Sequence, residues 1–110
     1  MSGQPPGSGI PSINRPNENE NCENLVINTN LRSPQANTIQ NLKKGDELII
    51  HAASDQGPLQ AFDDAGNLAG NIISREQAKL LACIIAGTEY IAEILSIENG
   101  QCDIQIRAVI

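Results

Sequence analysis

Residues that could do chemistry are few in this chain, and they stand far apart. Its three cysteines, at positions 22, 83 and 102, form no C-x-x-C pair and have no metal-ligand spacing. A nucleophilic thiol needs a positioned base, and the only histidine is His51. We interpret Cys83 and Cys102 as small core residues, because one falls in a helical pattern and the other in an inward strand position. Cys22 is expected to be exposed and is the thiol most open to oxidation.

The remaining polar candidates also have simpler structural interpretations. His51 lies in the middle of a predicted strand, where we expect a solvated imidazole or one at the core edge. Asp63 and Asp64 could form a carboxylate pair, but they precede Gly66 in a predicted hairpin loop, where Asp commonly bonds its own backbone. The sequence contains no phosphate loop, nucleophile elbow or zinc motif. We therefore expect no enzyme activity, no catalytic residue, no cofactor and no metal site.

The N-terminal segment differs in composition from the rest of the chain. Residues 1–24 are rich in Gly, Pro, Ser, Asn and Glu, which predicts a disordered leader before a single domain at residues 25–110. A metal or partner site in this leader is the alternative, but acidic residues at i, i+2 spacing make a poor cage; its members would be Glu18, Glu20, Cys22 and Glu23. The chain shows neither a secretion signal nor a long apolar span, so we expect a cytoplasmic protein without membrane contact.

Alternating apolar residues predict most of the strands. Leu25–Leu31 reads as a half-buried first strand. The stretch Leu42–Ile73 then contains three short apolar runs separated by turn residues, which predicts a β-meander. These runs are Leu48–Ala53, Leu59–Phe62 and Leu68–Ile73.

Two helices are predicted from capping and stop signals. Ser33 and Pro34 supply an N-cap and a first helical residue for a helix of about two turns, with Lys43 and Lys44 at its C-terminal end and Gly45 after it. A second helix is expected at residues 75–86, because residues 74–77 have the form of a capping box. Its expected apolar stripe is Leu80, Leu81, Ile84 and Ile85.

The C-terminal part predicts two more strands. Residues 89–98 are apolar on both faces, which suggests a central or bent strand. Asn99-Gly100 is a strong hairpin signal, and residues 101–110 alternate cleanly. The order of elements therefore predicts a mainly β fold: a small, partly open antiparallel barrel, OB-like or SH3-like, with one helix before the last two strands.

Within residues 39–98 the chain resembles the HIRAN domain family. The similarity rests on the pattern Leu42-x-x-Gly45-Asp46-x-Leu48, on Ala61-Phe62, and on Gly66-x-Leu68-Ala69-Gly70-x-Ile72 followed by a helix and an apolar strand. The resemblance implies a small β-barrel, and some members of that family bind single-stranded DNA ends. The family's binding loop carries an Arg and a Tyr, whereas this chain has residues 52–58 (AASDQGP) there, so only the fold is expected to carry over.

Charge and composition favour a protein partner over a nucleic acid. The chain has a net charge of −6 and only two aromatic rings, Phe62 and Tyr90, so it offers neither phosphate neutralisation nor a stacking platform. We therefore expect a non-catalytic protein-interaction module, and a HIRAN-like or OB-like single-stranded nucleic-acid or nucleotide-binding module is the alternative. The expected recognition surface is an acidic rim of Asp55, Asp63 and Asp64, where loop 54–58 and hairpin 63–67 lie together, with Asn67 as a further binding residue.

Overall fold

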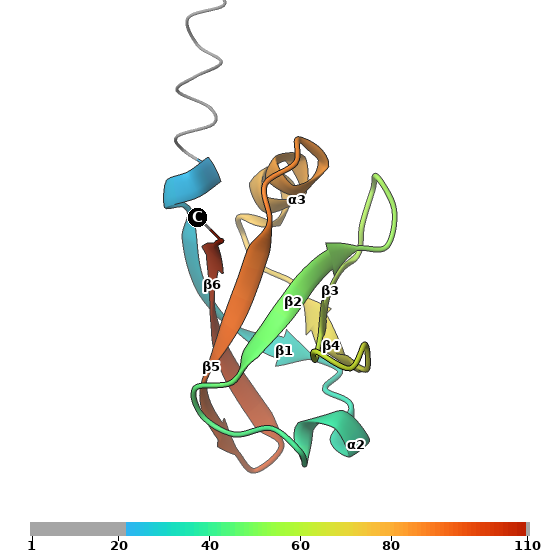
Figure 1. Ribbon diagram of the computed structural model, residues 1–110, viewed down its shortest axis with the longest axis vertical. Helices are drawn as coiled ribbons and strands as arrows, with labels where there is room; N and C mark the ends of the chain where they lie inside the picture. Colours follow the sequence, from blue (N-terminus) through green and yellow to red (C-terminus); the bar gives the residue numbers. More distant parts are fainter. Residues whose placement is uncertain (1–21, 110) are drawn as a thin grey trace, which may run out of the picture.

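A computed structural model describes residues 22–109, and its six strands close into one antiparallel barrel (Figure 1). Around the barrel the strand order is β1-β4-β3-β2-β5-β6. The predicted small β-barrel is therefore confirmed, and it is fully closed rather than partly open. In chain order the elements are β1 (Val26–Arg32), α2 (Ala36–Ile39), β2 (Glu47–Ala52), β3 (Leu59–Phe62), β4 (Leu68–Ile72), α3 (Gln77–Ile85), β5 (Tyr90–Glu98) and β6 (Gln101–Ala108).

The predicted meander forms as β2, β3 and β4. Ile50 pairs with Ala61 across β2 and β3, and Leu59 pairs with Ile72 across β3 and β4. Alternate residues of β2 and β3 are buried, as a pleated strand requires, whereas β4 buries Ala69, Gly70 and Ile72 next to a register shift with β3. Their side chains, together with Tyr90 and the inward positions of β6, make one continuous core. Fully buried members are Leu48, Leu59, Ile72, Leu80, Tyr90, Ile94, Cys102, Ile104 and Ile106.

The barrel closes where β1 meets β4, along a short seam. Only Leu31 with Ile72 and Arg32 with Asn71 are paired there, whereas β1 pairs with β6 along five residues. Gly70 allows this approach, because a Cβ at that position would lie 3.0 Å from the Leu31 Cβ and 3.2 Å from the Arg32 carbonyl oxygen.

The last hairpin combines a tight turn with a bulge. Asn99 and Gly100 both have positive φ, +52° and +83°, as a two-residue type I′ turn requires. The β5–β6 register shifts between Ile94 and Ser96, so the bent strand predicted for this segment is confirmed. Beyond Ile94, β5 has no pairing with β2, whereas β6 stays paired with β1 as far as Asp103.

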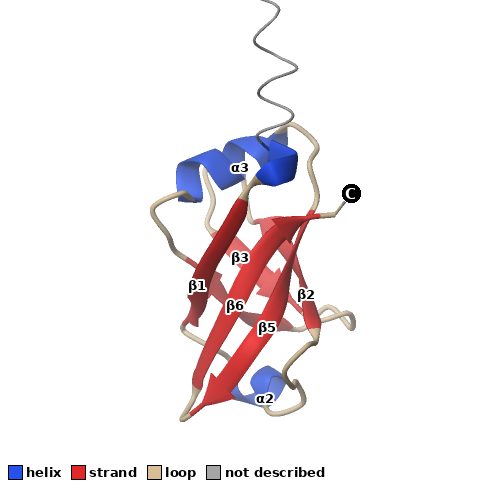
Figure 2. Cartoon of the chain, turned by 90° about the vertical axis from the view of Figure 1, so that its left-hand side faces the viewer, coloured by secondary structure: helices blue, strands red, loops and turns tan. Residues whose placement is uncertain are grey.

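α2 and α3 lie at opposite ends of the barrel (Figure 2). α2 is shorter than predicted and its expected cap is wrong: Ser33 is in the left-handed region with φ +52°, and the N-cap is Gln35, whose backbone N–H bonds Ala69 in β4 at 2.8 Å. Lys43 and Lys44 consequently follow the helix on an exposed connection to β2. α3 begins at Gln77 without a capping box, because the Ser74 hydroxyl accepts the backbone N–H of Glu76.

The buried face of α3 differs from the predicted stripe. Leu80 and Cys83 are its buried residues, Leu81 and Ile84 are half-buried, and Ile85 is 55% exposed. The stripe is therefore rotated toward Cys83, the position at which the chain is covalently joined to the segment before β1.

Cys22 is not an exposed thiol, since it forms a disulfide with Cys83 and is buried. The Tyr90 hydroxyl also donates a buried hydrogen bond of 2.6 Å to the Cys22 carbonyl oxygen. The sequence predicts neither contact, and both attach Cys22, three residues before the predicted domain start at Leu25, to the barrel. The predictions for residues 1–21, including the disordered leader, lie outside the described residues. Among residues 22–109, no helix is long and apolar enough to cross a membrane.

Candidate functional site

The expected acidic rim does not form as one surface. Loop 54–58 precedes β3 and hairpin 63–67 follows it, so the two lie at opposite ends of that strand. Successive turns of a meander alternate between its two ends, and this rule contradicts the predicted proximity. Asp55 stays exposed in its own loop, whereas Asp63 and Asp64 border a shallow depression shared with His51 and Phe62.

Asp63 serves its own turn, as predicted. Its carboxylate accepts the backbone N–H groups of Asn67 at 2.8 Å and Ala65 at 3.0 Å, and the Asn67 side-chain amide at 3.1 Å. These hydrogen bonds hold the pKa of Asp63 below its ordinary value, and the bond from the Asn67 backbone has the largest effect. Asn67 is likewise engaged within the hairpin, which leaves Asp64 as the acidic side chain of this turn that faces solvent without such bonds.

The thiols and the imidazole offer no assembled catalytic group within residues 22–109. Cys22 and Cys83 are joined, and burial raises the pKa of the Cys102 thiol to about 11, with the charge of Asp103 adding to the effect. His51 is exposed, and its ring lies 5.7 Å from that of Phe62. No group of three or more His, Cys, Asp or Glu side chains in this part of the chain could hold a metal ion.

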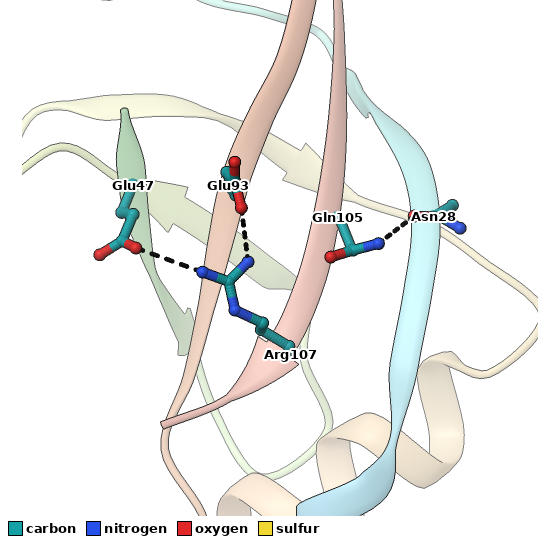
Figure 3. Close-up of polar contacts among 5 residues, drawn as sticks. All are labelled: Asn28, Glu47, Glu93, Gln105 and Arg107. Atoms are coloured by element: carbon teal, nitrogen blue, oxygen red, sulfur yellow. Dashed lines mark hydrogen bonds and ion pairs between the residues drawn. The ribbon is translucent and has the colours of Figure 1, made fainter. Parts of the chain in front are cut away.

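Ion pairs neutralise part of the outer face of the barrel (Figure 3). Arg107 on β6 donates to Glu93 on β5 at 2.8 Å and to Glu47 on β2 at 3.3 Å. On the other side of β6, Gln105 donates to Asn28 on β1 at 3.2 Å. This polar network ties four strands together and leaves no unpaired charge at Arg107.

A groove of about 770 Å³ lies at the end of the barrel that α2 occupies. One wall comes from α2 and the connection that follows it, and the other from the end of β5 and the hairpin turn (Figure 1). Leu95, 37% exposed, contributes an accessible apolar surface, and Leu42 and Ile97 are half-buried where they pack against the core. Its lining residues are Pro34, Ala36, Ile39, Gln40, Leu42, Lys43, Lys44, Leu95, Ser96, Ile97, Glu98 and Gly100.

The β5 wall of this groove is a strand edge. β2 pairs with β5 only as far as Glu93. One residue further along β5, the Ile94 carbonyl accepts the Gly45 N–H and the Ile94 N–H donates to the Asp46 carbonyl, both at 2.8 Å. In an antiparallel ladder closed by a two-residue turn, Glu98 and Gln101 form the hydrogen-bonded pair next to the turn. Ile97, opposite Cys102, then directs its backbone N–H and C=O away from β6 and toward the groove. Within residues 22–109 no loop or turn bonds these two groups.

Two lysines give the groove a local positive charge. Lys43 and Lys44 are exposed on its α2 side, and both ion pairs found among the described residues involve Arg107 instead. Glu98 is an acidic lining residue on the opposite, hairpin side. The groove therefore combines an apolar lining, a free backbone edge and two unpaired cations, although the chain as a whole is acidic.

Sequence reasoning did not identify this groove. The sequence predicts Lys43 and Lys44 at a helix end, and the apolar residues on both faces of residues 89–98 indicate a central or bent strand. The available signal is Leu95 close to the Asn99-Gly100 turn, which places an apolar residue near the end of a hairpin. Comparisons with protein-family models, with curated proteins and with solved structures found no match.

Proposed function

We propose that this protein is a non-catalytic protein-interaction module that binds a segment of another protein in the groove between α2 and the end of β5. The observation that carries the proposal is the unpaired backbone edge at Ile97 beside the exposed apolar side chain of Leu95. Adding an extended peptide to a free sheet edge gives main-chain hydrogen bonds, and neighbouring apolar pockets give specificity. Both elements are available in this groove.

A single-stranded nucleic-acid or nucleotide-binding module, of HIRAN or OB type, is the second candidate. Lys43 and Lys44 favour it, because lysines can neutralise phosphate. Base stacking does not support it: neither aromatic ring of the chain lines the groove, and Tyr90 is buried. With a net charge of −6, the chain also repels phosphate at longer range.

The cellular location is a separate part of the proposal. The sequence led us to expect the cytoplasm, where disulfides are uncommon, whereas a Cys22–Cys83 bond is typical of an oxidising compartment. Counting free thiols in protein alkylated directly in its source cells separates the two locations. One reactive thiol per denatured chain supports an oxidising location, and three support the cytoplasm.

Selection from a random linear peptide library, with the full chain as bait, tests the binding function. Leu95→Glu places a charge on the groove wall, and Ile85→Glu places one on an exposed apolar residue of α3 as a matched control. We expect selected peptides to bind the wild type and the control equally and to lose at least about tenfold in affinity for Leu95→Glu.

Two results would count against this function. One is that no peptide binds, and the other is that the selected peptides bind Leu95→Glu as tightly as the wild type. A single-stranded oligonucleotide titrated in parallel at physiological salt is expected to give no saturation. Micromolar binding that Leu95→Glu abolishes would instead support the nucleic-acid candidate.

A further inference from the structure

We propose that the groove selects an extended segment in which apolar and acidic residues alternate, with its carboxylates on the side of Lys43 and Lys44. This inference rests on the proposed function and adds the chemistry of the partner. It follows from three features of the groove: the direction of its strand edge, the apolar residues beside that edge, and the position of its two lysines.

The strand edge determines that the bound segment is extended. Gly45 and Asp46 already form two backbone hydrogen bonds with Ile94, as the first residues of an added strand would. Ile97 offers the next outward-facing backbone pair on the same edge, beyond the bulge. A helix has no free backbone groups in its interior to pair with this edge, whereas an extended chain has them at every second residue.

The period of an extended chain then determines the pattern of side chains. Successive residues of a strand point to opposite faces, so one set can enter the groove between Leu42 and Leu95 while the other set stays at the rim. Residues of the inward set should be apolar, because the lining there is Leu and Ile. Leu95 is exposed, and contact with an apolar side chain would remove its surface from water.

The charges of the groove determine which rim residues are favoured. Lys43 and Lys44 stand together on the α2 side, and no ion pair within residues 22–109 involves either side chain; the neighbouring Asp46 carboxylate accepts the Lys43 backbone N–H at 3.0 Å. Glu98 stands on the hairpin side and would repel a carboxylate placed there. An acidic segment is therefore favoured with its carboxylates toward α2, and a basic segment is disfavoured by the lysine pair.

The test compares what different baits select from one unbiased peptide library. The baits are the wild type, the double variant Lys43→Glu/Lys44→Glu, and Lys79→Glu, which reverses an exposed lysine on α3 away from the groove. The wild type and Lys79→Glu should both enrich Asp and Glu at alternate positions between apolar residues. The double variant should lose this enrichment or enrich Lys and Arg instead.

Binding measurements on one selected peptide complete the test. Replacing its acidic residues by Gln and Asn should weaken binding to the wild type by about fivefold or more, and raising the salt to about 0.5 M should have a similar effect. A scan of single backbone N-methyl groups should identify one position where binding is lost, opposite Ile97.

The possible outcomes separate this inference from the proposed function. If the peptides depend on Leu95 but show no acidic enrichment and no response to the double variant, the groove is an interaction site and the acidic partner is wrong. If no peptide depends on Leu95, the proposed function itself fails. Circular dichroism of the double variant, whose substitutions are both on exposed residues, verifies that any loss does not come from unfolding.

Discussion

The Asp63 carboxylate shows at the residue scale how an apparent site residue can be a structural one. Three donors from its own hairpin bind it, two of them from Asn67. Its neighbour Asp64 is exposed and makes none of these bonds. A pair of acidic residues that looks catalytic in the sequence therefore divides into one residue that holds the turn and one that faces solvent.

We predict that Asp63→Ala destabilises the protein more than Asp64→Ala, because only the first change removes the acceptor of the turn. Urea unfolding of both variants measures the difference. The pKa of Asp63 is lower in the folded state than in the unfolded state. Its contribution to the unfolding free energy is therefore present above the unfolded-state pKa and is lost as pH falls through the folded-state pKa. An NMR titration that places this pKa at or above 3.8 would contradict the assignment.

Cys102 should make the protein sensitive to alkali. Burial first, and Asp103 second, raise the pKa of its thiol from 9.0 to about 11, so the folded state retains a proton that the unfolded state loses. The contribution of the protonated thiol to the unfolding free energy is therefore fully present below pH 9.0. It is lost as pH rises toward 11, by up to about 1.4 kcal/mol per pH unit. The slope of unfolding free energy against pH in this window should be smaller for Cys102→Ala. Equal slopes in the two proteins would show that the thiol is not the group responsible.

At the scale of elements, α3 is the main cover of one barrel end. Leu80 is fully buried and Cys83 nearly so, whereas Ile85 faces solvent. We predict that Leu80→Ala lowers the unfolding free energy by about 2 to 5 kcal/mol and that Ile85→Ala changes it by less than about 0.5 kcal/mol. Denaturant midpoints of the two variants measure this contrast, and a similar cost at both positions would mean that α3 packs through a different face.

The Cys22–Cys83 disulfide joins the segment before β1 to α3, across 61 residues of sequence. Because it restricts the unfolded chain, its removal in a Cys22→Ala/Cys83→Ala variant should lower the unfolding free energy by about 2 to 5 kcal/mol.

Tyr90→Phe removes the hydroxyl that bonds the Cys22 carbonyl and should lower the unfolding free energy by about 1 to 3 kcal/mol. Thermal unfolding tests both changes. A double variant as stable as the wild type would show that this anchor contributes nothing to the fold.

On the scale of the whole molecule, the strands could be predicted from the sequence because the alternation of apolar residues is a local signal. The Asn99-Gly100 turn is equally local, since two positive φ angles select those residue types. The cap of α2 could not be predicted, because tertiary bonding to β4 at Ala69 overrides the preference of Ser33 and Pro34. Three cysteines allow several pairings, and only the closed barrel brings Cys22 to Cys83.

The groove depends on long-range structure in the same way. Lys43 and Leu95 lie 52 positions apart in the sequence, and they share a surface because the barrel brings the connection after α2 to the end of β5. The predicted acidic rim does not form, because it required two successive turns of a meander to lie together. Local patterns therefore predicted the elements, and the closure of the sheet determined which polar residues lie together.

Amide chemical shifts measured while a selected peptide is titrated into the full chain show whether the peptide binds in the groove between α2 and the end of β5. We expect the largest changes at residues 42–46 and 94–100, and we expect the Ile97 amide to become protected from hydrogen exchange. Asp55, Asp63 and Asp64 changed together to Asn should leave that pattern and the affinity unaltered. Shifts concentrated at residues 51–53 and 62–66 instead, with the Ile97 amide unprotected, would place the interaction at the depression bordered by His51, Phe62, Asp63 and Asp64 and not in the groove.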